Sequence, residues 1–206
     1  PAMRIETRYT VAESGFHVEQ VSFVTQYGTH VDAPKHFVEG RRTLERIELE
    51  ELMLPLFVLY FEDKVAADPE FIVHVDDIKR WEAEHGEIPA DSFVAFSSDW
   101  YHRMEGGDMN NFDAHCPGWG LDALKYLFEE RGVTAVGHET LDTDGSADVR
   151  ARGFLDCEKY VLESDHYQVE VMANLDKLPS TGGVIFVGLP KFDKFPGFPA
   201  CAWAVV

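Results

Sequence analysis

A short segment of the sequence gathers side chains that together suit a divalent cation. Gln26, His30, Asp32 and His36 follow one another at even spacings. On an extended chain, even spacing places side chains on one face. Imidazole nitrogen and carboxylate oxygen are good ligands for zinc or manganese, and an amide oxygen can add a weaker bond. The segment therefore predicts a metal site, beside which a neutral imidazole could serve as a general base.

The same segment is predicted to be extended and turning. Thr29 and Val31 disfavour helix because they are branched at Cβ, Gly28 lets the backbone turn, and Pro34 prevents a helix from continuing. A histidine such as His30, taken alone, more often satisfies a hydrogen bond in a core than it binds metal. The combination of four polar groups with the glycine and the proline favours the metal site.

The elements that must hold this segment form a mixed α/β chain with a largely β core. Alternating or continuous apolar runs predict strands at residues 4–11, 18–25, 56–61, 92–96, 133–136, 168–172, 184–187 and 201–206. Helical spacing of apolar residues predicts helices at 76–85, 121–131 and 158–163. The polar stretch 102–117 predicts a long binding loop.

Composition narrows the classes of partner. The 206 residues fit one domain, and a net charge of -19 repels phosphate backbones and anionic lipid, so neither nucleic acid nor membrane is expected as a partner. Cys116, Cys157 and Cys201 form no CxxC pair, and no apolar run approaches the ~20 residues that span a bilayer. We expect a reducing, cytoplasmic location. Because the chain opens on Pro1, we also expect a trimmed N-terminus.

The segment 26–36 resembles the hallmark of the cyclase family of metal-dependent hydrolases, which includes bacterial kynurenine formamidases and isatin hydrolases. That hallmark, His-x-Gly-Thr-His-x-Asp-x-Pro-x-His, is met at every fixed position except the first, where Gln26 stands. The block from Glu170 to Leu175 and the closing stretches 188–191 and 197–200 are similar to later family blocks. The resemblance covers nearly all of residues 1–206 as one domain. It implies that the domain lacks the family's first N-terminal strand.

The resemblance implies a role for each residue of the site. His36 matches the catalytic histidine, and the metal ligands would be Gln26, His30, Asp32, Glu170 and Glu158. Glu158 stands where two-metal relatives carry a histidine, so one ion or two remain open. Gln168 shares the face of Glu170 if this stretch is a strand, which makes it a weaker candidate ligand.

Substrate-binding candidates are mostly aromatic. They are Tyr27, Phe37, Trp100, His115, Trp119 and His138. Any one of these aromatic residues more often packs in a core than touches substrate. His138 and Glu139 replace a hydrophobic residue and an aspartate of the relatives. They either end a strand in a solvated acidic turn or lie beside the metal in place of the missing histidines.

The resemblance further implies an α/β fold with a largely β, barrel-like core and peripheral helices, the swivelling β/β/α fold. The implied reaction is hydrolysis of an amide-type C–N bond in a small, aromatic substrate, such as a formamide (arylformamidase activity) or a cyclic amide. Zinc or manganese would activate the water, and His36 would accept its proton and pass it to the leaving nitrogen. The alternatives are a lactone hydrolase and an inactive metal- or ligand-binding member. By analogy, a homodimer or homotetramer is expected.

Overall fold

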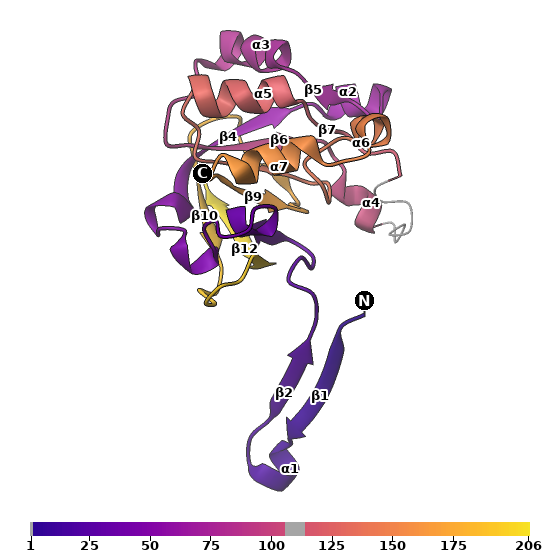
Figure 1. Cartoon of the computed structure of the whole chain (residues 1–206), viewed down its shortest axis with the longest axis vertical. Coiled ribbons are helices and arrows are strands. Elements are labelled where there is room, and N and C mark those ends of the chain that lie inside the picture. Colours follow the sequence, from indigo (N-terminus) through magenta and orange to yellow (C-terminus); the bar gives the residue numbers. More distant parts are fainter. Residues whose placement is uncertain (1, 106–113) are drawn as a thin grey trace.

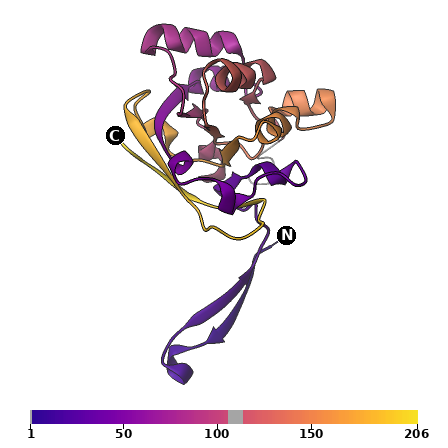
Figure 2. The same ribbon diagram turned by 60° about the vertical axis from the view of Figure 1, so that its left-hand side comes forward.

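A curled sheet of eight strands forms the centre of the computed structural model, which describes residues 2–105 and 114–206 (Figure 1). The strand order is β11-β3-β9-β8-β6-β4-β10-β12. The strands are β3 (His30–Asp32), β4 (Met53–Tyr60), β6 (Phe93–Ser97), β8 (Ala135–His138), β9 (Tyr167–Glu170), β10 (Gly183–Gly188), β11 (Gly197–Pro199) and β12 (Cys201–Val205). The sheet curls into a barrel-like core with helices around it (Figure 2), which confirms the predicted α/β class.

The four central strands β4, β6, β8 and β9 are parallel, and the flanking strands are antiparallel. The crossovers between them carry the helices α3 (Val75–His85), α5 (Leu121–Lys125) and α7 (Asp156–Glu163). Helix α5 continues into a π-helical turn, Tyr126–Glu130. In such sheets ligands bind at the carboxyl ends of the parallel strands, and these ends are where β8 and β9 deliver His138 and Glu170.

Apolar side chains leave both faces of the parallel strands, because both faces are covered. On β6, Val94 and Phe96 pack into the core beneath the helices, with Trp81, Leu124 and Val161. Their neighbours Phe93 and Ala95 point into the second core, which lies on the opposite face of the sheet. These two cores fix the register of the strands that carry the polar residues of the site.

The first two predicted strands form a separate hairpin. Strands β1 (Arg4–Tyr9) and β2 (Val18–Ser22) pair only with each other, and all their residues are exposed. The short helix α1 (Val11–Ser14) joins them, capped by the hydroxyl of Thr10. The hairpin extends away from the curled sheet (Figure 1). It is connected to the site through the residues that follow β2.

Other predictions need correction in detail. The strand predicted at 133–136 begins two residues later and ends on His138, so its last residue belongs to the site. Besides α1, the short helices α2 (Glu62–Ala67), α4 (Tyr101–Glu105) and α6 (Ser146–Arg152) were not predicted. The short strands β5 (Ile72–Val73) and β7 (Gly118–Trp119) also form a pair. The predicted loop 102–117 starts within α4, and its residues 106–113 lie outside the described part. Over the described residues, no helix is long and apolar enough to cross a membrane.

Candidate metal centre

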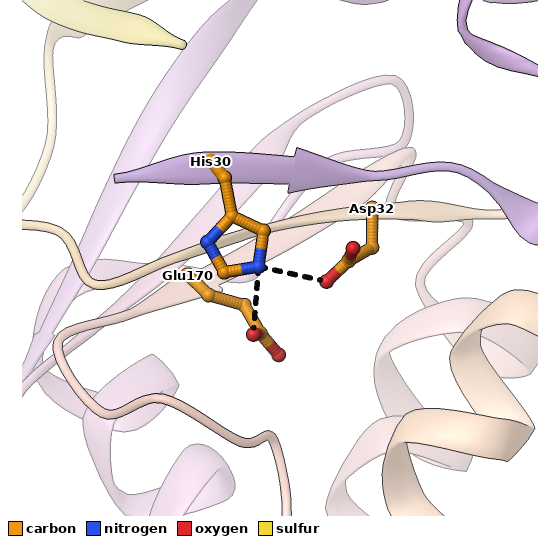
Figure 3. Close-up of side chains that lie close together, drawn as sticks. All are labelled: His30, Asp32 and Glu170. Carbon is orange, nitrogen blue, oxygen red and sulfur yellow. Dashed lines mark ion pairs between the residues drawn. The ribbon is translucent and has the colours of Figure 1, made fainter. Parts of the chain in front are cut away.

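Three buried side chains from two neighbouring strands meet at the centre of the site (Figure 3). His30 lies opposite Glu170 in the pairing of β3 with β9, and Asp32 lies two residues along the same face. The His30 Nε2 atom is 3.3 Å from Asp32 Oδ2 and 3.2 Å from Glu170 Oε2. All three side chains are at most 4% exposed. Two carboxylates and an imidazole therefore share one buried space.

The orientation of His30 suits a metal ligand. Its Nδ1 atom is 2.8 Å from the carbonyl oxygen of Gly28, so Nδ1–H is the donor there. Gly28 has a φ of +66°, a conformation that glycine adopts without strain. Within the described residues, His30 Nε2 is buried without a hydrogen bond. Donors bound to one tetrahedral ion at about 2.0–2.1 Å lie about 3.3 Å apart, so these three residues fit a small divalent cation.

A second group of donors shares Asp32 with the first. The Nε2 atom of His36 is 4.0 Å from Asp32 Oδ1 and 3.7 Å from Glu158 Oε1, and the donor atoms of this group lie within 4.8 Å of one another. Glu158 is buried on α7, and burial together with the charges of Glu170 and Asp32 raises its pKa to about 11. A cation beside it would allow this carboxyl group to ionise.

The first group carries a bound proton when no cation is present. Burial lowers the pKa of His30, but the close contacts and negative charges of Asp32 and Glu170 outweigh that effect and raise it to about 10. Burial opposes ionisation of Asp32, and its contacts with His30 lower its pKa overall. At neutral pH an incoming ion therefore has to displace protons from His30 and Glu158.

We expect the apparent affinity for Zn²⁺ to rise steeply with pH. Since both pKa values lie above 9, each displaced proton adds about one decade of affinity per pH unit between pH 6 and 9. An ordinary histidine site would level off above about pH 7. Calorimetric Zn²⁺ titrations in buffers of different ionisation enthalpy count the protons released. An affinity that stays flat between pH 7 and 9 would contradict the expectation.

The four polar residues of segment 26–36 converge, although not along one extended face as the spacing predicted. Only His30 and Asp32 lie on a strand, whereas His36 ends a 3-10 turn, Pro34–His36, and Gln26 is brought back by a bend. The amide nitrogen of Gln26 donates to Asp32 Oδ1 at 3.1 Å and lies 3.4 Å from His36 Nδ1. Gly197 makes room for this, because a Cβ there would lie 2.5 Å from the Gln26 amide nitrogen.

Asp144 sets the position of Glu158, and sequence reasoning missed it. Its buried carboxylate accepts hydrogen bonds of 2.9–3.0 Å from the backbone nitrogens of Cys157 and Glu158, in the first turn of α7. A cap of this kind satisfies donors that the helix itself leaves free. Asp144 lies more than ten positions before the helix, so no local capping pattern in the sequence could reveal it.

Replacing Asp144 with alanine is expected to lower the free energy of unfolding by about 2 kcal/mol, since buried N–H groups lose their acceptor. Zn²⁺ affinity should also fall, because Glu158 is no longer fixed. Asp144→Asn keeps one oxygen acceptor and should lose less on both measures. Urea unfolding in chelator, followed by Zn²⁺ titration, tests this. Equal effects of the two substitutions would argue against capping.

The substrate candidates are scattered over the structure. Phe37 is half-buried, and its ring lies edge-on to His36 at 5.2 Å, while Tyr27 is 42% exposed on the loop after Gln26. Trp100 and Trp119 are packed in the core beneath the helices. The His115 side chain is 69% exposed and pairs with Glu70 on the surface. Of these five, only Tyr27 and Phe37 belong to or directly follow the segment that carries the site.

His138 and Glu139 are both buried at the end of β8, not in a solvated turn. Glu139 Oε2 accepts hydrogen bonds from Ser98 N, Ser98 Oγ and Trp100 N. Burial raises the pKa of Glu139 to about 7 in spite of these bonds. The His138 Nε2 atom lies 3.5 Å from Glu170 Oε1, which places His138 next to the central group. Gln168 lies there too, donating to the same oxygen at 2.8 Å.

Comparison with known proteins gives a consistent result. Residues 2–145 match the sequence profile of the Cyclase family. An isatin hydrolase from Roseibium aggregatum is 31% identical over 187 residues, which covers 87% of this chain and 71% of that protein.

Two solved structures support the same relationship. Isatin hydrolase A from Ralstonia solanacearum has a TM-score of 0.89 at 28% identity, over 98% of this chain and 81% of that one. An isatin hydrolase bound to the product analogue thioisatinate has a TM-score of 0.90 at 28% identity, over 100% and 82% of the two chains. The chain that folds around these buried histidine and carboxylate side chains belongs to the cyclase family.

Proposed function

We propose that the protein is a metal-dependent hydrolase that opens the amide C–N bond of a small aromatic substrate, in particular a cyclic amide of the isatin type. The observation that carries the proposal is the buried group His30, Asp32 and Glu170, in which one imidazole nitrogen faces two carboxylates at 3.2–3.3 Å. The similarity to isatin hydrolases over most of the chain supports both the reaction class and the substrate class.

His30, Asp32 and Glu170 would hold the ion. Gln26 adjoins this group through its hydrogen bond to Asp32, and Glu158 adjoins it through its contact with His36. Zinc or manganese bound there supplies Lewis acidity, which polarises a carbonyl group and lowers the pKa of a water. The protein itself supplies orientation: Gly28 aligns His30, and Gln26 and Gln168 donate to Asp32.

His36 is the residue that would move protons in this reaction. Its side chain is 30% exposed, whereas Asp32 and Glu158 beside it are at most 3% exposed. It therefore lies where substrate can reach it. Its imidazole would accept a proton from the attacking water and then donate it to the leaving nitrogen, so that the ring opens to an amine and a carboxylate.

Aromatic side chains near His36 support an aromatic substrate. Phe37 lies beside His36, and the half-exposed Phe154 is 6.0 Å from Phe37 between ring centroids. On the other arm of the segment, Phe23 contacts both Tyr27 and Phe198. The partly exposed rings of Phe37 and Phe154, on the side of His36, can stack against a flat substrate.

Turnover of three substrates tests the proposal: isatin, an N-formyl aryl amide and a small lactone. The protein is stripped with chelator and reloaded with Zn²⁺ or Mn²⁺. We expect isatin to have the highest kcat/KM and the chelated protein to be inactive. Preference for the lactone would show that the bond cleaved is an ester-type C–O bond and not an amide C–N bond. Metal binding without turnover of any of the three would show a binding protein and overturn the proposal.

A further inference from the structure

His138 occupies a special place on the face of the sheet that carries the site. Strands β3, β9 and β8 are neighbours, and Glu170 on β9 lies opposite His30 on β3. The pairing of β8 with β9 aligns Val136 with Gln168 and Gly137 with Val169. One step further along this parallel register, His138 comes beside Glu170. The two histidines therefore flank Glu170 from its two neighbouring strands.

The imidazole of His138 is buried without ordinary hydrogen bonds. It is 1% exposed, and among the described residues neither ring nitrogen has a hydrogen-bond partner. Burying a polar ring in this way is costly unless a nearby group compensates. Glu170 Oε1 is such a group, since it lies 3.5 Å from His138 Nε2.

The two oxygens of Glu170 face different surroundings. Oε2 lies 3.2 Å from His30 Nε2, on the side where Asp32 completes the central group. Oε1 accepts the amide hydrogen of Gln168 at 2.8 Å and is the oxygen that His138 approaches. In turn Thr143 donates to the amide oxygen of Gln168, which fixes the direction of that amide. One oxygen is thus turned towards His30 and the ion position, and the other towards the amide of Gln168 and the ring of His138.

We propose that His138 is a positioning residue of the metal centre, which together with Gln168 holds Glu170 Oε1 so that Oε2 alone is presented to the ion. The inference rests on the proposed metal site. Partners behind a ligating carboxylate fix its direction, and their removal typically weakens metal binding by about 10–100-fold. Gln26 turns its amide nitrogen, not its oxygen, towards Asp32. Because this leaves Glu170 as one of few ligands for the ion, the direction of its carboxylate matters more.

Three variants of the full chain test the role of His138. His138→Phe removes both nitrogens and keeps a flat ring, whereas His138→Gln retains an N–H donor. His166→Phe is the matched control, because His166 is a partly buried histidine that stacks on Phe128 and precedes the start of β9, whereas Glu170 ends that strand. The measurements are Zn²⁺ affinity by competition with a chromogenic chelator, thermal unfolding in chelator, and the visible spectrum of the Co²⁺-loaded protein.

We expect His138→Phe to bind Zn²⁺ about 10–100-fold more weakly than the parent and to change the Co²⁺ spectrum. His138→Gln should recover most of this affinity, and His166→Phe should bind as the parent does. An affinity of His138→Phe within threefold of the parent would overturn the proposal. Equal losses for the Phe and Gln variants would also overturn it, since an N–H donor would then not suffice.

The outcome separates this inference from the proposed function. A parent that binds Zn²⁺ but hydrolyses none of the three substrates refutes the hydrolase and leaves the affinity comparison intact. A parent that turns over isatin while His138→Phe keeps its Zn²⁺ affinity refutes only the role of His138. Unfolding in chelator identifies any variant whose weak binding results from a damaged fold.

Discussion

Replacing Asp32 with asparagine is expected to lower kcat/KM by about 10³-fold and to strip the protein of its metal. Asp32 is the one residue shared by both donor groups, reaching His30 on one side and His36 on the other. It is fully buried, and its pKa is held below the usual range by its contacts with His30. The asparagine side chain has nearly the shape of aspartate but lacks its negative charge. A loss of about 4 kcal/mol in transition-state stabilisation corresponds to about 10³-fold.

Metal content by elemental analysis and kcat/KM for isatin are to be measured together on the same preparation. Asp193→Asn serves as control, because that side chain is 74% exposed and pairs with Lys194 on the surface. If Asp32→Asn keeps its metal and stays within fivefold of the parent, Asp32 is not a ligand.

Replacing His36 with alanine is expected to lower kcat by about 10²–10⁴-fold with little change in metal affinity. The reason is that His36 lies at the partly exposed side of the site, whereas the central group of donors is complete without it. Activity measured against metal content distinguishes this result from that of Asp32→Asn. His85→Ala is the control, since His85 stacks on Trp81 at the end of α3.

A His36→Ala protein that loses its metal would assign His36 to the ligand set instead. Partial rescue of activity by added imidazole would support a role in proton transfer. Retention of full activity would exclude the role of general base.

The sequence predicted which residues gather at the site better than how the chain brings them together. His30 and Asp32 could be found because a strand places alternate residues on one face. Gln26 and His36 reach the same space through a bend and a 3-10 turn, which even spacing cannot describe. That Glu170 lies opposite His30 is a tertiary pairing. It was predicted only through the resemblance to a family and not through any local pattern.

What the sequence could not show depends on contacts between distant residues. The cap that Asp144 provides for α7 and the close approach of Gly197 to Gln26 arise only when separate elements pack. The central strands were predicted because both of their faces are buried, which gives continuous apolar runs. The short helices α2, α4 and α6 escaped because a few residues carry too little periodicity to identify.

The pairing of β3 with β9 joins residues 140 positions apart, since His30 meets Glu170. An ion bound between them can exist only in chains that have closed this long loop. The ion should therefore act as a thermodynamic clamp on the native state and leave the denatured ensemble untouched. At a free concentration 100 times the dissociation constant, it would add about 2.7 kcal/mol to global stability. The melting temperature should therefore rise with the free zinc concentration, because zinc binds only chains in which this loop is closed.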